Sequence, residues 1–517
     1  MRQESQRSLA EEFPTFRAAW RALRAASRWA FRTFRRPVKV AAKVVLALLV
    51  ASIAFHTILL LTWKHAVDRK LAEVRRRGEP VTFVEAVPKP VPDRENGALL
   101  YRRAFEVLSP AAWPAATSDV LREFVSGAGP PPQPPTPDLV GATRPGPARQ
   151  PAPKPSDPAQ IEQEVRELIR RNEAVFPLVR QAAARPRCVF PVDWRQRPEA
   201  DVPHRINLTR ILRLLQAKAI LDTRDGRTEE ALDDIVLILR MAPSGENDPD
   251  WWPLFSQSLC VRTATKGLRV AAKRAPISAA QARRVYDELG RVSLDPEMAR
   301  AVGLERLECN WSFDKMRRDL PGFYEVYIYD YAPGYRPPKT SELGPIERLG
   351  RKLVTHFWRP MCYREQSDCL DAIDRYARVE GLTYRELVRR VPPHGYLRAP
   401  KRTLQAGVYW PNLATLWSMR DQARAEAGLA KAAMALKAHK SHFGSYPASL
   451  SELRRRLGWQ VPDDPFSGRP FVYRRQGKGF ILYSWDHNLK DDGGKTNEEA
   501  HTSRDPNKGD VVWKCEK

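Results

Sequence analysis

Oxygen-bearing side chains gather near the C-terminus, in the segment 482–494, which reads LYSWDHNLKDDGG. An apolar run stops at Ser484, and two glycines close the segment. Between them stand Asp486, Asn488, Asp491 and Asp492. Carboxylate and amide oxygens can bind a hard cation, and glycine permits the tight backbone that such a loop needs. A hydrated turn held by its own hydrogen bonds is the alternative interpretation.

The rest of the chain offers little other chemistry. It contains no HExxH, GxSxG, Walker or GxGxxG motif. His439 and His442 could share a metal, although exposed histidines at a helix end are commoner than ligands. Glu305 and Glu308 could do acid–base work if burial raised the pKa of one of them, although a salt-bridged face is commoner. The sequence therefore gives no positive case for a catalytic site.

The charge of the chain bears on its partners. Its 517 residues carry a net charge of +25, and arginine and lysine are spread along nearly the whole length. Nucleic-acid binding favours a concentrated patch or a recognised module, so we expect no nucleic-acid partner. A basic protein that lies close to an anionic membrane fits the same charge.

One apolar segment predicts the compartment. Residues 44–63 form a run of 20 without a formal charge apart from His56, which is enough to span the hydrocarbon core as a helix. A signal peptide is the alternative, but its apolar region is usually shorter and precedes a cleavage site. Eleven Lys or Arg precede the run and six follow it up to Arg77. This bias predicts a single span in the cytoplasmic membrane, with the N-terminus inside and the bulk of the chain extracytoplasmic.

Composition divides the chain into six parts. A basic cytoplasmic tail (1–43) and the transmembrane helix (44–63) precede a juxtamembrane helical segment (64–126). Next come a Pro-rich linker (127–158), a helical domain (159–417) and a C-terminal unit (418–517) that we expect to be separable. Within the helical domain, Gly226 suits a left-handed helix end and Thr228 a new helix start. The six cysteines form no CxxC pair, and Cys362 and Cys369 would lie too far apart on an unbroken helix for a disulfide.

The C-terminal unit has its own pattern of elements. An amphipathic helix is predicted first, and its apolar face comprises Leu429, Ala432, Ala433 and Leu436. A turn and a short helix follow, where Ser449 and Glu452 have the spacing of a capping box. Two strands then form a hairpin across the sequence QGKG, and DVVW forms a last strand.

This order resembles the C-terminal half of the major pseudopilin of type II secretion, the general secretion pathway protein G family. The resemblance covers about a fifth of the chain. The matching residues are Gly444, Tyr446, Pro447, Leu450, Glu452, Leu453, Asp464, Pro465, Gly468, Pro470, Tyr473, Tyr483, Ser484, Asp491, Asp492, Gly493, Gly494, Asp510 and Trp513.

The resemblance implies a small α+β domain whose acidic loop binds calcium. Calcium takes six to eight oxygen ligands, which a flexible loop rich in Asp, Asn and carbonyl groups can supply. The ligands expected are Asn488, Asp491, Asp492 and Asp510, with backbone carbonyls near Ser484. The family usually has Ser-x-Gly-x-Asp-Gly here. In this chain Asn488 replaces an Asp, and Asp486 is expected to compensate.

A second departure concerns assembly. True pseudopilins carry a Gly-Phe cleavage site and a Glu at the edge of the N-terminal helix, whereas this chain reads RRPVKVAAK before Val44. We therefore do not expect it to polymerise as a processed pilin subunit. The architecture of this chain, a large membrane-anchored protein with a pseudopilin-like tail, resembles that of envelope proteins of planctomycetes.

Together these patterns predict a mainly α fold with an N-terminal transmembrane helix, a helical extracytoplasmic scaffold and a pseudopilin-like α+β tail. The expected function is that of a non-catalytic, single-pass envelope protein whose tail binds envelope or secretion-system proteins. The alternative is a membrane-anchored extracytoplasmic hydrolase with its site in a cleft of the helical region. A deep pocket with converging Glu, His or Asp side chains would favour the hydrolase.

Overall fold

The structure is a computed structural model. It describes residues 14–109, 124, 157–196, 201–245, 248–323, 343–390, 413–496 and 509–515. Within these ranges the protein is mainly helical, as the sequence predicts. The earlier helices are α2 (Pro14–Arg76), α3 (Ala98–Val107), α5 (Pro158–Arg171), α6 (Val175–Ala183), η2 (Trp194–Gln196), α7 (Pro203–Arg224), α8 (Thr228–Arg240), α9 (Trp252–Arg274), α10 (Ala279–Arg291) and α11 (Asp295–Arg318). The later elements are α13 (Pro345–Ala377), α14 (Tyr384–Arg390), α15 (Leu413–Phe443), α16 (Ser451–Leu457), β1 (Val472–Gln476), β2 (Gly479–Ser484) and β3 (Val511–Cys515).

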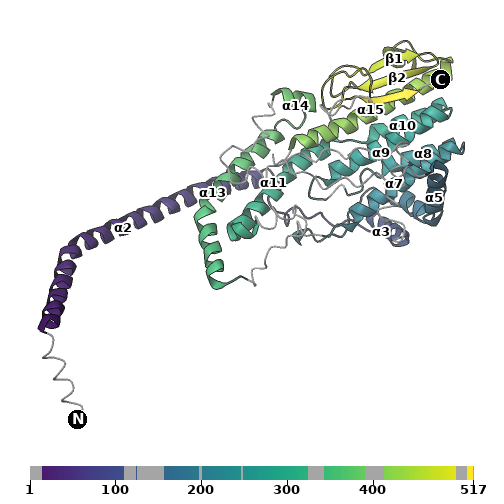
Figure 1. The fold of residues 1–517 in the computed structure, drawn as a ribbon. Coiled ribbons are helices and arrows are strands. Elements are labelled where there is room, and N and C mark those ends of the chain that lie inside the picture. The colour runs from purple at the N-terminus through teal and green to yellow at the C-terminus, as the bar shows by residue number, and fades with distance from the viewer. Residues whose placement is uncertain are drawn as a thin grey trace.

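Helix α2 leaves the body of the molecule as a long arm, drawn in purple in Figure 1. Its segment Lys39–Arg76 is the one helix of the described residues that is long and apolar enough to cross a membrane, a test that a signal sequence also passes. The apolar side chains from Val44 to Phe55 are exposed. The helix continues without a break past both ends of the apolar run, so residues 14–43 of the predicted tail, the span and the juxtamembrane start belong to one element.

Helices α7, α8 and α9 pack against one another at the centre of the helical region. Pro203 stands in the first turn of α7, where a missing N–H breaks no helical hydrogen bond. The chain leaves α7 through Gly226, whose φ of 81° is left-handed, and α8 begins at Thr228. Both boundaries were predicted from the sequence and are confirmed.

Helix α15 is buried over most of its surface. No side chain between Leu416 and Lys440 is exposed. The prediction of an amphipathic helix is therefore wrong, because two layers cover α15. Helices α9 and α10 pack on one side, and strands β2 and β3 pack on another (Figure 1). Its many alanines leave room for both layers to approach closely.

The C-terminal sheet is antiparallel, in the order β1-β2-β3. Strands β1 and β2 form a hairpin in which Gln476 pairs with Gly479, and Gly477 in the turn has a φ of 54°. Strand β3 pairs with β2 from Ser484 opposite Val511 onward. The predicted hairpin and last strand are thus confirmed.

Two local predictions fare differently. The capping box expected from Ser449 and Glu452 does not form, because the Ser449 hydroxyl bonds to the Ser451 hydroxyl at 2.8 Å and α16 begins only at Ser451. A capping box does form at the start of α10, between Ser278 and Gln281. All six cysteines are buried free thiols, and Cys362 and Cys369 lie on the same helix, α13. The Pro-rich linker up to residue 156 lies outside the described residues, and the six-part division stays a prediction.

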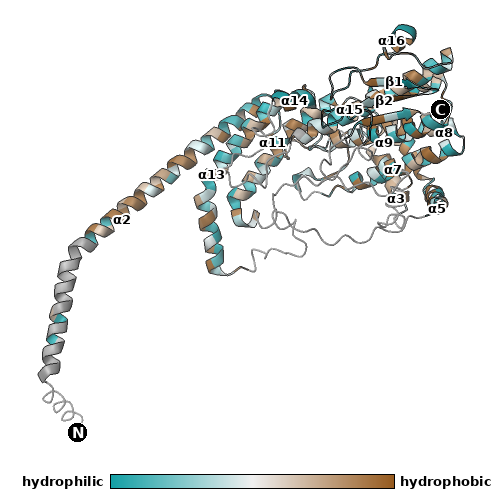
Figure 2. Ribbon diagram, turned by 45° about the horizontal axis from the view of Figure 1, so that its top comes forward, coloured by the Kyte–Doolittle hydropathy of each residue, from teal (hydrophilic) through white to brown (hydrophobic). Residues whose placement is uncertain are grey.

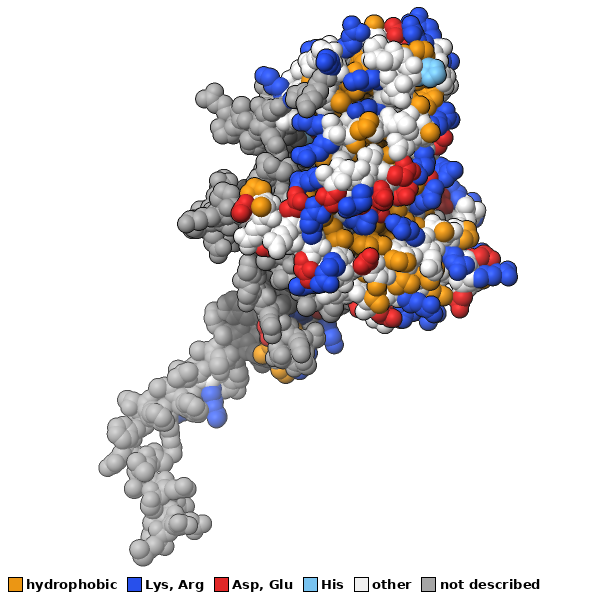
Figure 3. Space-filling view, turned by 90° about the vertical axis from the view of Figure 1, so that its right-hand side faces the viewer, with side chains coloured by type: hydrophobic (Ala, Val, Ile, Leu, Met, Phe, Trp, Pro, Cys, Tyr) orange, Lys and Arg blue, Asp and Glu red, His pale blue; other side chains and the backbone are white. Residues whose placement is uncertain are grey.

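The surface mixes its charges and is apolar along the arm. On the face in Figure 3, basic and acidic side chains lie interspersed rather than in one basic patch. Arg166, for example, bonds to Glu162 and Asp225 at 2.7 and 2.6 Å. Figure 2 shows that hydrophobic residues dominate the middle of α2 and recur along α13 beside it.

Candidate functional site

Asp464 lies beneath the acidic loop (residues 484–494). It is a buried carboxylate that was not predicted from the sequence as a site residue. It accepts hydrogen bonds from the Ser484 hydroxyl at 2.6 Å and from the backbone N–H groups of Phe466 and Ser467, both at 3.1 Å. The bonds to residues two and three positions ahead are typical of an Asp that starts a turn, a signal visible in the sequence DDPFSG. Ser484 is fully buried, and its hydroxyl is committed to this turn.

Asp486 leaves the loop and faces α15. Its Oδ1 accepts from the Gln422 side chain at 3.2 Å and from the His487 N–H at 2.7 Å. Its φ of 57° is left-handed, as is the φ of 59° at Leu489, which is unusual for residues with a side chain. The left-handed backbone at Asp486 and Leu489 reverses the chain within the loop, and the Asp486 side chain points toward α15.

Asn488, Asp491 and Asp492 lie together in a hydrogen-bonded loop. The Asn488 amide donates to Asp492 Oδ2 at 2.8 Å, and that oxygen also accepts from the Gly509 N–H at 2.7 Å. Asp491 Oδ1 accepts from the Tyr483 hydroxyl at 3.1 Å and from the Gly493 N–H at 2.9 Å. The loop is therefore tied both to β2 and to the segment before β3.

Asp510 joins the loop to the last strand, as the sequence predicts for a residue that closes the site. Its two carboxylate oxygens accept from the Asp492 N–H at 3.3 Å and the Gly494 N–H at 2.7 Å. Burial first, and the nearby charges of Asp491 and Asp492 second, raise the pKa of Asp510 to about 6, although the two backbone hydrogen bonds oppose this rise. Gly494 has a φ of 78°, and a Cβ there would lie 2.8 Å from Ile481, so only glycine fits.

The structure thus brings together four of the six predicted ligands: Asn488, Asp491, Asp492 and Asp510. The Asp486 side chain bonds to Gln422 instead, and Ser484 was expected to contribute its backbone carbonyl, which its hydroxyl bond to Asp464 does not test. The four make hydrogen bonds within the loop, and in the described parts of the chain no three His, Cys, Asp or Glu residues gather in a way that could hold a metal. The loop as described does not fit a ready calcium cage. Calcium binding stays a prediction, and we derive no chemistry through it.

The two histidines at the end of α15 do not act together. His439 is buried, and its Nδ1 bonds to the Ser445 carbonyl at 2.9 Å, whereas His442 is exposed and packs edge-on against Phe443. His439 thus holds the turn after the helix, which is a structural role.

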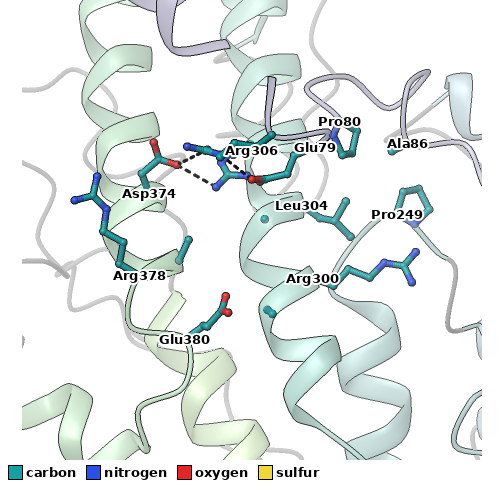
Figure 4. A pocket seen from close by; sticks show the side chains of 14 residues that line it. Glu79, Pro80, Ala86, Pro249, Arg300, Leu304, Arg306, Asp374, Arg378 and Glu380 are labelled. Carbon is teal, nitrogen blue, oxygen red and sulfur yellow. Dashed lines mark hydrogen bonds and ion pairs between the residues drawn. The ribbon is translucent and has the colours of Figure 1, made fainter. Parts of the chain in front are cut away.

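A pocket of about 550 Å³ lies where the end of α2 meets α11 and α13 (Figure 4). Arg306 of α11 stands at its side with its side chain 3% exposed, between Glu79 and Asp374. It pairs with both carboxylates, and the distance to Asp374 is 3.0 Å. Arg77 pairs with the same two carboxylates at 2.8 and 3.4 Å. The four side chains form one ion-pair network that fastens α2 to the helical region.

The chemistry of this pocket is limited by that network. The described residues that line it include carboxylates and arginines but no His, Ser, Thr or Cys. Glu79 and Asp374 each pair with the guanidinium groups of Arg77 and Arg306, so both carboxylates are already engaged in ion pairs. The ion pairs beside the pocket hold the helices together. The lining of the pocket suits the binding of small polar molecules better than nucleophilic catalysis.

A buried polar cluster in the helical region was missed by sequence reasoning. His204 Nε2 lies 3.1 Å from Asp248 Oδ2, and Arg205 pairs with Asp248 and Asp250, both at 2.8 Å. The Arg205 guanidinium also lies over the ring of Trp252. The residues come from the start of α7 and the segment before α9, so no local spacing in the sequence links them. His204, Asp248 and Asp250 are buried, Arg205 is partly buried, and the cluster joins these two elements.

No protein-family model, no curated protein and no solved structure matches this chain.

Proposed function

We propose that the chain is a single-pass envelope protein, held in the cytoplasmic membrane by α2 with its N-terminus inside. The helical region is a non-catalytic scaffold, and the C-terminal sheet with its acidic loop is an interaction or assembly module. Its partners are envelope proteins, with a type II secretion-like system as the candidate suggested by the pseudopilin resemblance.

The bare apolar surface of α2 is the observation that carries this proposal. None of the side chains from Val44 to Phe55 is covered by the rest of the protein. In water such a surface is unfavourable by about 25 cal/mol for each Å² left uncovered, whereas lipid removes that cost. A cleaved signal sequence would leave the same surface, but α2 continues to Arg76 and its end is fastened by the Arg77 and Arg306 ion pairs.

Fusion of alkaline phosphatase to the C-terminus of the full chain tests the topology. We expect an active fusion at the membrane with an uncleaved N-terminus, shown by intact mass. The matched control carries Leu49→Lys and Ile53→Lys, because each lysine at the centre of a span costs about 2.5–3.5 kcal/mol of insertion. An inactive fusion made at normal levels would overturn the orientation, and a shortened chain would identify a signal peptide.

The role of the tail as an interaction module is supported by the edge of its sheet. Strand β1 pairs only with β2 in the described sheet, and Arg474, Arg475 and Gln476 are exposed along it. An open edge strand offers backbone groups to another chain. A photo-crosslinking residue at Gln476 should capture envelope proteins in cells. One at Glu230, exposed on α8, is the matched control, and equal products from both positions would count against the module.

The alternative is a membrane-anchored extracytoplasmic hydrolase, which would use the pocket beside Arg306. Its carboxylates are the feature that favours it, and their ion pairs with arginine weigh against it. Purified full-length protein should not hydrolyse ester, peptide or phosphoester substrates above background. Turnover that disappears in Asp374→Asn, with the melting temperature unchanged, would favour the hydrolase.

A further inference from the structure

The first half of α13 has its polar and apolar faces reversed relative to a helix on the surface of a soluble protein. Its large apolar side chains are exposed, with Ile346 at 87% and Phe357 at 63%, and Leu349 and Leu353 are also bare. At 3.6 residues per turn these four side chains fall on one side of the helix. On another side, Thr355 is buried and its hydroxyl accepts from the Leu320 N–H at 3.1 Å, and Arg351 pairs with Asp319 at 3.4 Å. The polar side thus packs on the protein and the apolar side faces out.

This helix also contacts α2 inside the apolar run. His56 Nε2 lies 3.1 Å from the His356 carbonyl, and the two imidazole rings stack with centroids 4.9 Å apart. His56 precedes the end of the run at Trp63 by seven residues, which is about 10 Å along a helix. The hydrocarbon core is about 30 Å thick. The contact at His56 therefore lies well within the depth that α2 would span.

The contact is one end of a continuous seam. Toward the body of the molecule, Trp63 lies under Arg364, and the Lys70 ammonium bonds to the Ser367 hydroxyl at 2.8 Å. The side chains of α2 that are partly covered follow a helical spacing, at His56, Leu59, Leu60, Trp63, Ala66 and Val67. The first half of α13 diverges from α2 in both ribbon views (Figures 1 and 2). Pro360 lies inside α13, and a proline inside a helix commonly bends the helix axis, which accounts for this divergence.

We propose that Pro345–Arg359 is a second membrane-contacting element, an amphipathic helix whose apolar stripe inserts into the leaflet nearer the globular body, beside α2. This inference rests on α2 spanning the membrane. The occupant of the stripe is lipid, because the stripe continues from a contact already within the apolar run. Arg348, Lys352 and Arg359 are exposed on the flank of the helix, where long basic side chains can reach anionic headgroups.

The six native cysteines are all buried, so a single introduced cysteine can carry a probe on the full chain. Leu349→Cys and Phe357→Cys place an environment-sensitive fluorophore on the stripe. Ile53→Cys on α2 is the positive control, and Glu230→Cys on α8 is the aqueous control. Each protein is reconstituted into phosphatidylcholine–phosphatidylglycerol vesicles, with and without a nitroxide attached to the lipid acyl chains.

We expect blue-shifted emission and lipid-dependent quenching at positions 349 and 357, of the same order as at position 53, and no quenching at position 230. Quenching at 53 but not at 349 or 357 would overturn this inference and leave the anchor intact. Absence of quenching at 53 as well would overturn the proposed anchor. Blue-shifted probes at 349 and 357 that no lipid quenches, together with 349–349 crosslinks between chains, would assign the stripe to a second copy and also overturn the lipid assignment.

Discussion

Helices α2 and α15 are two long helices with opposite surroundings. The run of α2 from Val44 to Phe55 is bare, whereas α15 from Leu416 to Lys440 has no exposed side chain. The bare run contains no charge, while α15 holds Arg420 and Asp421 fully buried. A helix covered by protein can carry charges because each finds a partner, and a helix covered by lipid finds none. The two helices therefore differ mainly in whether the rest of the protein supplies partners for their side chains, rather than in their apolar content.

Removing one partner layer from α15 should have the largest effect on this comparison. The fragment 418–517 keeps the sheet but loses α9 and α10, so one side of α15 becomes exposed. Composition predicts a separable unit, and about 100 residues can bury an adequate core. Because α15 packs on α9 and α10, we instead expect this fragment to aggregate or to give a poorly dispersed NMR spectrum. The full chain in detergent is the reference. A well-dispersed spectrum would show that the sheet alone secures α15 and that the C-terminal unit is separable.

Removing the partner of a buried charge should come next. Arg420 Nε bonds to Asp421 at 2.8 Å, and the other Asp421 oxygen accepts from the Tyr384 N–H at 2.6 Å. Burial raises the pKa of Asp421, and Arg420 opposes that rise. Asp421→Ala removes the buried partner of the guanidinium and leaves it, among the described carboxylates, only the exposed Asp295 at 3.7 Å, which should cost about 3–5 kcal/mol and lower the melting temperature by several degrees. Asp287→Ala, which breaks an exposed pair with Arg283, is the control and should cost under about 0.5 kcal/mol.

Crowding the contact between α15 and the tail should have a smaller effect. A Cβ on Gly428 would lie 2.6 Å from the Phe471 ring, so Gly428→Ala should destabilise the protein by about 1–3 kcal/mol despite the better helix propensity of alanine. Gly290→Ala on α10 is the matched control, because its nearest atom would be the mobile Lys431 ammonium at 3.6 Å, and it should be neutral or stabilising. Adding Phe471→Leu to Gly428→Ala should recover part of the loss. Equal melting temperatures for the two alanine variants would contradict the close packing.

The acidic loop gives the smallest expected effect, and it depends on pH. The folded-state pKa of Asp510 is about 6, above its ordinary value, so ionisation of this carboxyl is less favourable in the folded protein than in the unfolded chain. Its contribution to stability should fall as pH rises from about 4 to about 6, by about 1 kcal/mol after solvent screening. The melting temperature of wild type relative to Asp510→Asn should therefore be higher at pH 5 than at pH 7.

Calcium provides a second arm of the same measurement. If calcium binds beside Asp510, it stabilises the ionised form, and at a hundredfold excess over its Kd it adds about 2.7 kcal/mol at pH 7. Wild type in calcium would then melt higher than in EDTA, and Asp510→Asn would lose most of that gain. Identical curves in calcium and EDTA would leave a loop held by hydrogen bonds alone.

Sequence reasoning located what depends on neighbours in the chain. The break at Gly226, the start at Thr228 and the hairpin around Gly477 follow from local backbone preferences, and all three are confirmed. The second covered side of α15 was missed because its partners, such as Phe471, come from distant segments and alanine gives a weak periodic signal. The apolar stripe of α13 has the same helical period whether it points inward or outward, so no pattern could tell the two apart.

The acidic loop shows the same limit within a site. The spacing of Asn488, Asp491 and Asp492 predicted that they would lie together, and the structure agrees. Asp486 was expected to contribute its side chain and Ser484 its backbone carbonyl; the Asp486 carboxylate instead bonds to Gln422, and the Ser484 hydroxyl bonds to Asp464. Both of those partners lie tens of residues away in the sequence. Hydrogen bonds over such separations are set by packing and cannot be found from local spacing.

The two-sided burial of α15 has a consequence for how the protein is made. About 120 residues separate the end of α10 at Arg291 from the start of α15 at Leu413. At roughly 5–20 residues per second, synthesis leaves the apolar bed on α9 and α10 uncovered for about 6–24 s. Nascent chains in this interval expose the apolar surface of α9 and α10. A chain that ends before α15 leaves that surface exposed. We therefore expect chains that stop before Leu413 to bind holdase chaperones and to be degraded faster than chains in which α15 has docked on α9 and α10.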